Sequence, residues 1–255
     1  MKTCIFINSC DKTHDVAKIY LKGHSKYIQN NSYKTFIGIN KLKHDEKYDF
    51  LNYISCKASD WKNETISQLS ILKNEYKYTN VILVLDDFIF NKKIDCTNLN
   101  FFLDQFKKKS LKYLSLKNHN ESFLISLINK FYLKNKINKL RNNYPYYSSL
   151  QIAIWDIDYL INNIKMSRSI WDFETLKNSD NHYHVKYNYF SYQHIVEKGE
   201  WNYYSPIYVR RYIGDFNPGK RKVKKDLFGF LIFNIRFVFF FLFGFSLSRI
   251  RKFFF

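Results

Sequence analysis

Short apolar runs that stop at polar or acidic residues constrain the fold of this chain more than any other feature of its sequence. Residues 81–85 are five consecutive aliphatic side chains, and the chain passes from them directly into Asp86 and Asp87. Residues 4–7 form a similar run, which is followed by the polar segment 8–11. Runs of this length with a polar stop are typical of buried strands in a parallel sheet.

Helical patterns separate these runs. We expect helices over residues 14–29 and 63–76, with Asp60 as a cap near the start of the second, and a strand over residues 35–40. This alternation indicates an α/β fold, with a mostly parallel, Rossmann-like sheet flanked by helices. The later segments are predicted in this order: helix 99–109, strand 111–116, a Lys- and Asn-rich helical stretch to residue 142, an extended stretch 144–155 and a short helix 156–165.

Composition divides the chain into two parts. We expect residues 1–209 to form one domain and residues 210–255 to form a basic, Phe-rich tail with eleven Lys and Arg against two Asp. Within the tail, residues 227–247 are apolar except for interruptions such as Asn234 and Arg236. We favour a monotopic segment that lies in the cytoplasmic leaflet of the plasma membrane, with the cations on anionic headgroups. A membrane-spanning helix and a buried core helix remain the alternatives.

The formal charge of the chain is +19, but this large value excludes few functions. Most of the cations are Lys, and Asn and Ile are abundant, so AT-rich codon usage is one explanation of the excess in the first 209 residues. A basic total otherwise suggests nucleic acid or an anionic membrane. We expect no nucleic-acid partner, because the Phe residues of the tail cluster away from its cations. The four cysteines form no CxxC pair and no signal-peptide run is present, which predicts reduced thiols in the cytoplasm.

Three groups of polar residues that we expect near the carboxyl ends of strands are candidates for a ligand site. Open parallel sheets bind their ligands beyond these ends. The candidates are residues 9–11, Asp60 and the adjacent pair Asp86 and Asp87. Two adjacent carboxylates disfavour joint ionisation unless a cation or hydrogen-bond donors neutralise them. A divalent cation that bridges a diphosphate uses one or two carboxylates in this way. The alternative is a simple strand-to-loop turn capped by the pair.

Five motifs in this order resemble GT-A-type bacterial glycosyltransferases of lipopolysaccharide and capsule assembly. The likeness covers about residues 3 to 205, and each motif is weak by itself. It is carried by Ser9-Cys10-Asp11, Asp60-Trp61, Leu85-Asp86-Asp87-Phe88, the stretch from Tyr146 to Trp155, and Trp171-Asp172-Phe173-Glu174. The segment from His194 to Trp201 is similar to the H-x-x-x-x-G-x-W ending of that family.

The resemblance implies an inverting hexosyltransferase that transfers a sugar from a nucleotide-sugar donor to a glycan or glycolipid acceptor at the membrane surface, with Mn²⁺ or Mg²⁺ as cofactor. Its implied site residues fall into four groups. They are Ser9, Cys10, Asp11, Asp60 and Asp86 at the donor; Asp87 and Asp86 at the metal; Ser149, Gln151, Trp155 and Trp171 at the acceptor; and Glu174, or Asp172, as general base.

Several features depart from that pattern or permit other interpretations. The acidic pair is adjacent rather than D-x-D, and Ile170 stands where a Pro is expected. Trp155 and Trp171 are equally compatible with core packing, and Glu174 with a solvated surface. The alternative functions are a nucleotidyltransferase, which lacks its usual Gly-rich phosphate loop here, and a non-enzymatic basic protein that binds membrane or nucleic acid.

Overall fold

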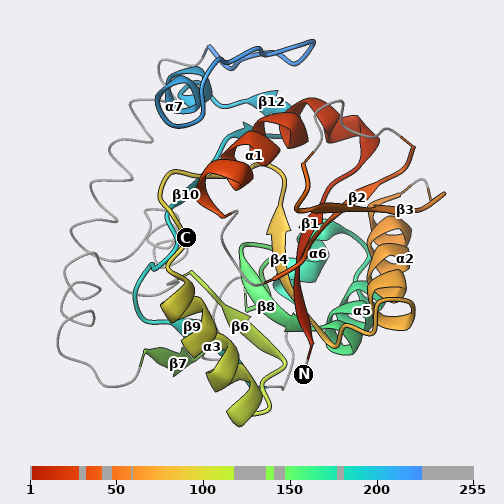
Figure 1. Ribbon diagram of the computed structural model, residues 1–255. Coiled ribbons are helices and arrows are strands. Elements are labelled where there is room, and N and C mark those ends of the chain that lie inside the picture. Colours follow the sequence, from red (N-terminus) through yellow and green to blue (C-terminus); the bar gives the residue numbers. More distant parts are fainter. Residues whose placement is uncertain are drawn as a thin grey trace, which may run out of the picture.

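A computed structural model of the chain describes residues 2–28, 33–41, 48–58, 60–117, 136–140, 147–176 and 181–225. Within these ranges the chain forms an eight-stranded sheet in the order β3-β2-β1-β4-β8-β6-β9-β7 (Figure 1). The strands are β1 Thr3–Asn8, β2 Thr35–Ile39, β3 Leu51–Ser55, β4 Asn80–Leu85, β6 Tyr113–Ser115, β7 Ile137–Lys139, β8 Ala153–Asp156 and β9 His182–Val185. The helices are α1 His14–Tyr27, α2 Trp61–Asn74, α3 Cys96–Lys108, α5 Ile157–Met166, α6 Ile170–Thr175 and α7 Ser205–Tyr212.

One half of the sheet is parallel. Strands β3, β2, β1 and β4 lie side by side and run in the same direction. From β1 the chain proceeds outward through β2 to β3, and then returns to place β4 on the other side of β1. The strand order therefore reverses between β1 and β4, as in doubly wound α/β folds.

The other half of the sheet is mixed. Strand β8 is antiparallel to both β4 and β6, whereas β6 and β9 are parallel and β7 is antiparallel to β9. Four of the seven neighbouring pairs are thus parallel, and the prediction of an α/β fold with a mostly parallel sheet flanked by helices is confirmed.

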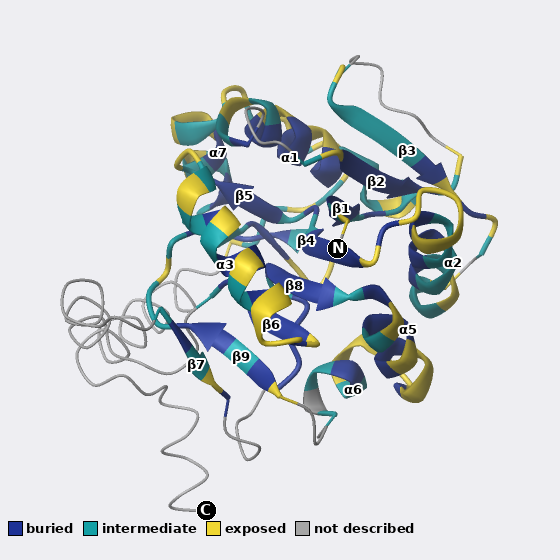
Figure 2. Cartoon of the chain, turned by 60° about the horizontal axis from the view of Figure 1, so that its bottom comes forward, coloured by how far each residue is buried: buried dark blue, intermediate teal, exposed yellow. Residues whose placement is uncertain are grey.

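The central strands of the sheet are buried between helices (Figure 2). Alternating side chains of the strands form two separate cores, one on each face of the sheet. On one face, Ile5 and Ile82 pack with apolar residues of α1 and α3. On the other face, Phe6 and Leu83 pack with apolar residues of α2, α5 and α6. Successive side chains of a strand point to opposite faces of the sheet, and helices cover both faces. Most residues of a central strand are therefore buried, which explains why these strands are continuous apolar runs in the sequence.

Among the differences from the sequence predictions, two concern the main sheet before residue 140. Strand β3 was not predicted, because its sequence contains no continuous apolar run. It lies at the edge of the sheet, and its side chains are mostly half-buried there. Residues 137–139 were predicted to be helical, and this was wrong: they form β7, where Ile137 pairs with Val185 of β9. Tertiary pairing overrides a weak local helix preference here.

The described part of the tail is packed against the domain. Helix α7 runs across the predicted boundary between Val209 and Arg210, so this boundary falls inside a helix. Further on, Val223 forms a parallel bridge with Trp201. Residues 227–247, for which a membrane segment was predicted, lie outside the described residues. Among the described residues, no helix has the length and apolar character needed to cross a bilayer.

A buried histidine gives the fold a specific response to acid. His24 is 1% exposed on α1, between the hydroxyls of Tyr20 and Thr35, each 3.2 Å from one ring nitrogen. Burial lowers the pKa of His24 to about 3 from 6.5. The folded state therefore holds this ring neutral, whereas the unfolded chain takes up a proton below pH 6.5.

We predict that the free energy of unfolding falls by about 2 kcal/mol between pH 6.5 and pH 5 through His24 alone. Urea titrations at both pH values, on wild type and His24→Gln, measure this contribution as the part of the pH dependence that the variant loses. His14→Gln, on the half-buried first residue of the same helix, is the control. An equal pH dependence in wild type and His24→Gln would contradict the prediction.

Candidate active site

Two adjacent strands deliver the first polar residues of the site. Strands β1 and β4 pair in register, with Asn8 opposite Leu85, so the next residues, Ser9 and Asp86, emerge at the same edge of the sheet. This edge is the carboxyl end of the parallel strands, at the point where the strand order reverses. Open α/β sheets bind their ligands in the crevice at such a point.

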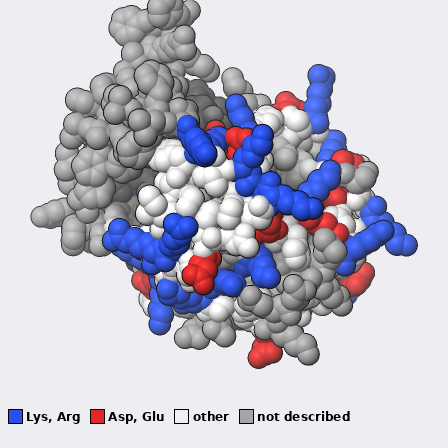
Figure 3. All heavy atoms as spheres, turned by 90° about the horizontal axis from the view of Figure 1, so that it is seen from above, with Lys and Arg blue, Asp and Glu red and all other residues white. Residues whose placement is uncertain are grey.

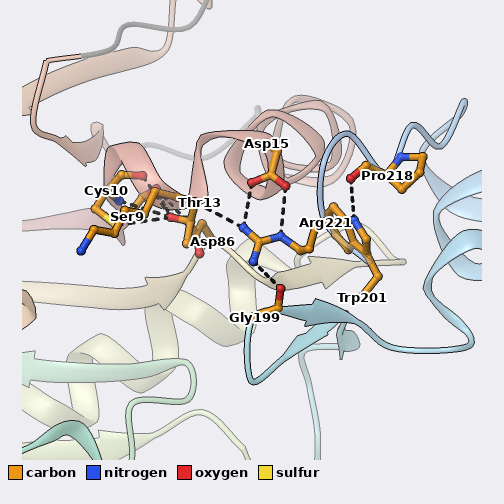
Figure 4. Close-up of polar contacts among 10 residues, drawn as sticks. Ser9, Cys10, Thr13, Asp15, Asp86, Gly199, Trp201, Pro218 and Arg221 are labelled. Carbon is orange, nitrogen blue, oxygen red and sulfur yellow. Dashed lines mark hydrogen bonds and ion pairs between the residues drawn. The ribbon is translucent and has the colours of Figure 1, made fainter. Parts of the chain in front are cut away.

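Asp86 is buried at this edge and is held by two hydroxyl groups. Its Oδ2 accepts hydrogen bonds from Ser9 Oγ and Thr13 Oγ1, each at 2.6 Å (Figure 4). Thr13 ends the short 3₁₀ turn Asp11–Thr13, which brings its side chain back toward Ser9. Burial, together with the neighbouring Asp87 carboxylate, raises the pKa of Asp86 to about 7, although both hydroxyls and Arg221 oppose the shift.

Asp87 has one oxygen engaged and one without a partner. Its Oδ2 lies 2.7 Å from Nε2 of His194, and the side chain is 19% exposed. Its Oδ1 is buried and accepts no hydrogen bond from any part of the chain that the structure describes. A buried carboxylate oxygen without a donor is rare in folded proteins and calls for a cation, water or ligand.

Strand pairing explains why His194 faces the acidic pair. Strand β5 Phe88–Phe90 follows Asp87 and pairs antiparallel with β10 Tyr192–His194, with His194 opposite Phe88. The backbone N–H of Ile195 donates to the carbonyl of Asp87 at 3.0 Å. Tyr204 Oη and Asn202 Nδ2 both donate to the carbonyl of His194, which fixes the end of β10.

The residues at this edge are compatible with a hard divalent cation only if a ligand completes its shell. Among the described residues, no cluster of three or more His, Cys, Asp and Glu is arranged to hold a metal ion. Mg²⁺, however, is commonly held by one or two carboxylates together with substrate phosphates. The unpartnered Oδ1 of Asp87 beside Asp86 supplies such a partial set, so these residues fit a cation that shares its coordination with a diphosphate.

Glu174 lies on α6, close enough to His194 for the two charges to interact. Its Oε1 accepts a hydrogen bond from the backbone N–H of Leu150 at 3.4 Å. Burial raises the pKa of Glu174, while the contacts with Leu150 and Ser149 and the charge of His194 oppose this shift. A carboxylate whose pKa is raised toward neutrality is suited to proton transfer. Gln151, one residue on from Leu150, accepts a hydrogen bond from Tyr192 Oη at 3.2 Å.

Some predicted donor-site residues hold the framework of this edge. Asp11 accepts hydrogen bonds from the backbone N–H groups of Asn40 and Lys41, each at 2.9 Å, and so ties the end of β1 to the end of β2. Asp60 caps α2 as predicted, and its two oxygens accept from the backbone and side chain of Asn63. Cys10 is half-buried, with Sγ 3.7 Å from Thr13 Oγ1.

The predicted acceptor-side residues are not all brought together. Ser149 is buried beside Glu174, but Trp155 is 0% exposed within the core between the sheet and α5 and α6. Trp171 is 70% exposed on α6. Asp172, the second candidate base, accepts a hydrogen bond from the backbone N–H of Arg168 at 2.7 Å, on the turn before α6.

A cation from the tail also reaches the site. Arg221 forms a two-point contact with Asp15 of α1, through Nε at 3.0 Å and Nη2 at 2.9 Å, and donates from Nη1 to the carbonyl of Gly199 (Figure 4). Gly199 has φ +80° in the turn between β11 Val196–Glu197 and β12 Glu200–Trp201. Arg221 therefore joins the hairpin that follows His194 to the helix that follows Ser9.

Sequence reasoning missed three of these contributors. Thr13 follows Ser9 by four residues, a spacing that would have shown both hydroxyls on one turn. His194 was noted as the start of the segment that resembles the H-x-x-x-x-G-x-W ending, and its proximity to Asp87 is visible only after β5 and β10 pair. Arg221 carries no local signal, because its partner Asp15 is 206 residues away.

Comparisons with known proteins show only distant likeness. No family model matches the chain, and no curated protein matches it. S. aureus TarS, residues 1–349 in complex with UDP-GlcNAc, has a TM-score of 0.49 at 12% identity over 79% of this chain. A cytidylyltransferase from Leptospira borgpetersenii has 0.41 at 13% identity, with 68% of each chain covered. The bifunctional glycosyltransferase WbbM has 0.37 at 12% identity, with 64% of this chain and 33% of that chain covered.

This chain spans 60% of the length of the TarS fragment that it matches. With TM-scores below 0.5 and identities of 13% or less, the three likenesses assign no activity to the chain. The function must be inferred from its own residues.

Proposed function

We propose that this protein is a metal-dependent glycosyltransferase that transfers a sugar from a nucleotide-sugar donor to a cell-surface glycan acceptor. The observation that carries the proposal is the acidic pair at the reversal of strand order, in which buried Asp87 Oδ1 accepts no hydrogen bond from a described residue. The resemblance of the motifs around this pair to glycosyltransferases of lipopolysaccharide and capsule assembly supports the same function.

The donor is proposed to bind along the carboxyl ends of β1 and β4. A Mn²⁺ or Mg²⁺ ion held by Asp87, with Asp86, would neutralise charge on the departing nucleoside diphosphate. Ser9 and Thr13 fix the orientation of Asp86, and His194 fixes that of Asp87, so that the unpartnered Oδ1 is set in place before a ligand arrives. Preorganised groups of this kind need no rearrangement during the reaction.

Glu174 is the proposed general base. Its carboxylate takes the proton of an acceptor hydroxyl, and the hydroxyl oxygen forms a bond to the anomeric carbon of the sugar. At the same time the bond between that carbon and the diphosphate oxygen breaks, so the nucleoside diphosphate leaves with the electron pair. Such a single displacement inverts the anomeric centre. Ser149 and Gln151, which border Glu174 and Tyr192, are proposed to contact the acceptor.

A donor panel tests this proposal. The full chain with Mn²⁺ is incubated with individual nucleotide sugars, and thermal stability and released nucleoside diphosphate are measured. A donor that binds the folded state stabilises it by mass action, so one nucleotide sugar is expected to raise Tm in the presence of Mn²⁺. Slow hydrolysis of that donor is expected to release nucleoside diphosphate even without an acceptor.

The product distinguishes the alternatives. Release of pyrophosphate from a nucleoside triphosphate and a sugar phosphate would replace the proposal with a nucleotidyltransferase. The absence of a Tm shift with every nucleotide sugar would contradict a donor site at Asp86 and Asp87. The Glu174→Gln variant serves as a separate probe, since it is expected to keep the Tm shift and to lose transfer to the acceptor.

A further inference from the structure

Three exposed apolar side chains gather at one turn of the molecule. Met166 is 60% exposed at the end of α5, and Ile170 and Trp171 are 38% and 70% exposed at the start of α6. They are three of the five large apolar side chains that are exposed within the described ranges, and they lie within six residues of each other. We propose that this patch, Met166, Ile170 and Trp171, docks on the surface of an anionic lipid bilayer.

Cations border the patch. Lys165 and Arg168 are exposed on the same turn. Lys62 of α2 donates from Nζ to the carbonyls of Lys165 and Ser167, at 2.7 and 2.9 Å, which holds the turn in its observed shape. Trp beside Lys and Arg is the combination found at membrane–water interfaces, where the ring enters the headgroup region and the cations contact lipid phosphates.

Two nearby carboxylates offset part of this positive charge, since accepting hydrogen bonds at a helix end leaves a carboxylate its negative charge. Asp60 bonds to Asn63 at the start of α2, and Asp172 accepts from the backbone of Arg168. Elsewhere, on the face of the molecule seen in Figure 3, Lys and Arg side chains are spread over the surface with Asp and Glu between them. A net charge of +19 attracts the whole molecule to an anionic surface, and the patch gives that attraction an orientation.

A bilayer fits this patch better than a protein partner does. A stable protein interface uses about 20–30 residues on each side, whereas three apolar side chains around a single turn are too few. Stable attachment to a bilayer ordinarily needs two weak signals acting together. The chain supplies a second candidate in its own Phe-rich, basic residues 227–255.

Docking at this patch would set the direction of the active site. Trp171 and Glu174 lie three residues apart on α6, and α5 and α6 are neighbours at one end of the molecule (Figure 2). If the proposed function holds, docking would place α6, the helix that carries the base, close to the bilayer, where a lipid-linked acceptor is held. The docking itself depends only on the exposed residues and not on that activity.

Quenching of tryptophan fluorescence by brominated lipids tests the proposal without a donor or acceptor. The chain has four Trp, of which Trp155 and Trp201 are 0% exposed, Trp61 is half-buried and Trp171 is 70% exposed. The full chain is mixed with vesicles of phosphatidylcholine and phosphatidylglycerol, with and without bromine on the acyl chains near the headgroup. We expect quenching in wild type that Trp171→Phe removes, since the other three rings lie deeper in the protein.

Sedimentation with the same vesicles measures affinity. Trp171→Ala is expected to weaken binding about tenfold, corresponding to about 1.4 kcal/mol. Ile207→Ala is the matched control, because Ile207 is 71% exposed on α7, away from the patch, and should leave binding unchanged. Sedimentation without quenching of Trp171 would show that another segment attaches the chain and would overturn the proposal. Equal binding to vesicles of phosphatidylcholine alone would overturn its anionic character.

Discussion

The Asp87→Asn variant is expected to lose at least about 1000-fold in kcat/KM for sugar transfer while it keeps its fold. A bound metal contributes several kcal/mol of stabilisation to developing charge, and about 4 kcal/mol corresponds to three orders of magnitude in rate. Asn retains one oxygen at this position but removes the negative charge that holds a cation. The contact with His194 at 2.7 Å is also weakened, since an amide oxygen is a poorer acceptor than a carboxylate.

Two measurements make this expectation specific. Steady-state rates of nucleoside diphosphate release give kcat/KM, and titration with Mn²⁺ in the presence of the donor gives the affinity for the metal. Asp158→Asn is the matched control. Asp158 lies on α5, its side chain is 62% exposed, and it pairs with Lys73 of α2. An Asp87→Asn protein with Mn²⁺-dependent activity near that of wild type would remove Asp87 from the metal site.

The neighbouring Asp86 is expected to respond differently. Because burial raises its pKa to about 7, its charged form destabilises the fold as pH rises from about 4 through 7. Asp86→Asn keeps an oxygen that accepts from Ser9 and Thr13, and it removes the buried charge. At pH 8 the variant is therefore expected to be more stable than wild type by about 1–3 kcal/mol, as measured by urea unfolding. Equal stability at pH 8 would show that the charge is compensated within the folded chain.

The parallel half of the fold was predictable from sequence because its signals are local. Strands β1, β2 and β4 each occupy an apolar run, and Asp60 marks the start of α2 by a cap that depends only on neighbouring residues. The position of β8 between β4 and β6 was not predictable. An apolar strand of this length has the same sequence pattern whether it pairs parallel or antiparallel. The antiparallel direction of β8 is set by its contacts with β4 and β6, which are distant in sequence.

The same division applies to the candidate site. The acidic pair could be found from sequence, since two carboxylates directly after an apolar strand are costly without a partner. What makes the two carboxylates unequal could not be found, because it comes from Thr13 at one and His194 at the other. His194 reaches Asp87 only through the pairing of two three-residue strands that are about 100 residues apart. Short strands of this kind leave no periodic pattern in a sequence.

The Trp155→Ala variant is expected to lose about 3–5 kcal/mol in the free energy of unfolding, which is a large share of the stability of an ordinary domain. Trp155 is 0% exposed, and its ring lies 4.3 Å from that of Tyr113 and 5.7 Å from that of Phe173, measured between centroids. Removal of the indole leaves a cavity that the rigid strand β8 cannot close. Urea unfolding at 25 °C measures the loss, and Trp171→Ala, at the exposed ring, is expected to change stability by less than about 0.5 kcal/mol.

Trp155→Phe then separates packing from acceptor contact, the role that the resemblance implied for this residue. The indole Nε1 has no hydrogen-bond partner among the described residues, so Phe loses part of the ring volume and no hydrogen bond. If Trp155 acts through the core alone, Trp155→Phe lowers stability modestly and leaves the KM for the acceptor unchanged. A KM that rises severalfold at unchanged kcat would instead place the ring at the acceptor, and would require the core around β8 to open when the acceptor binds.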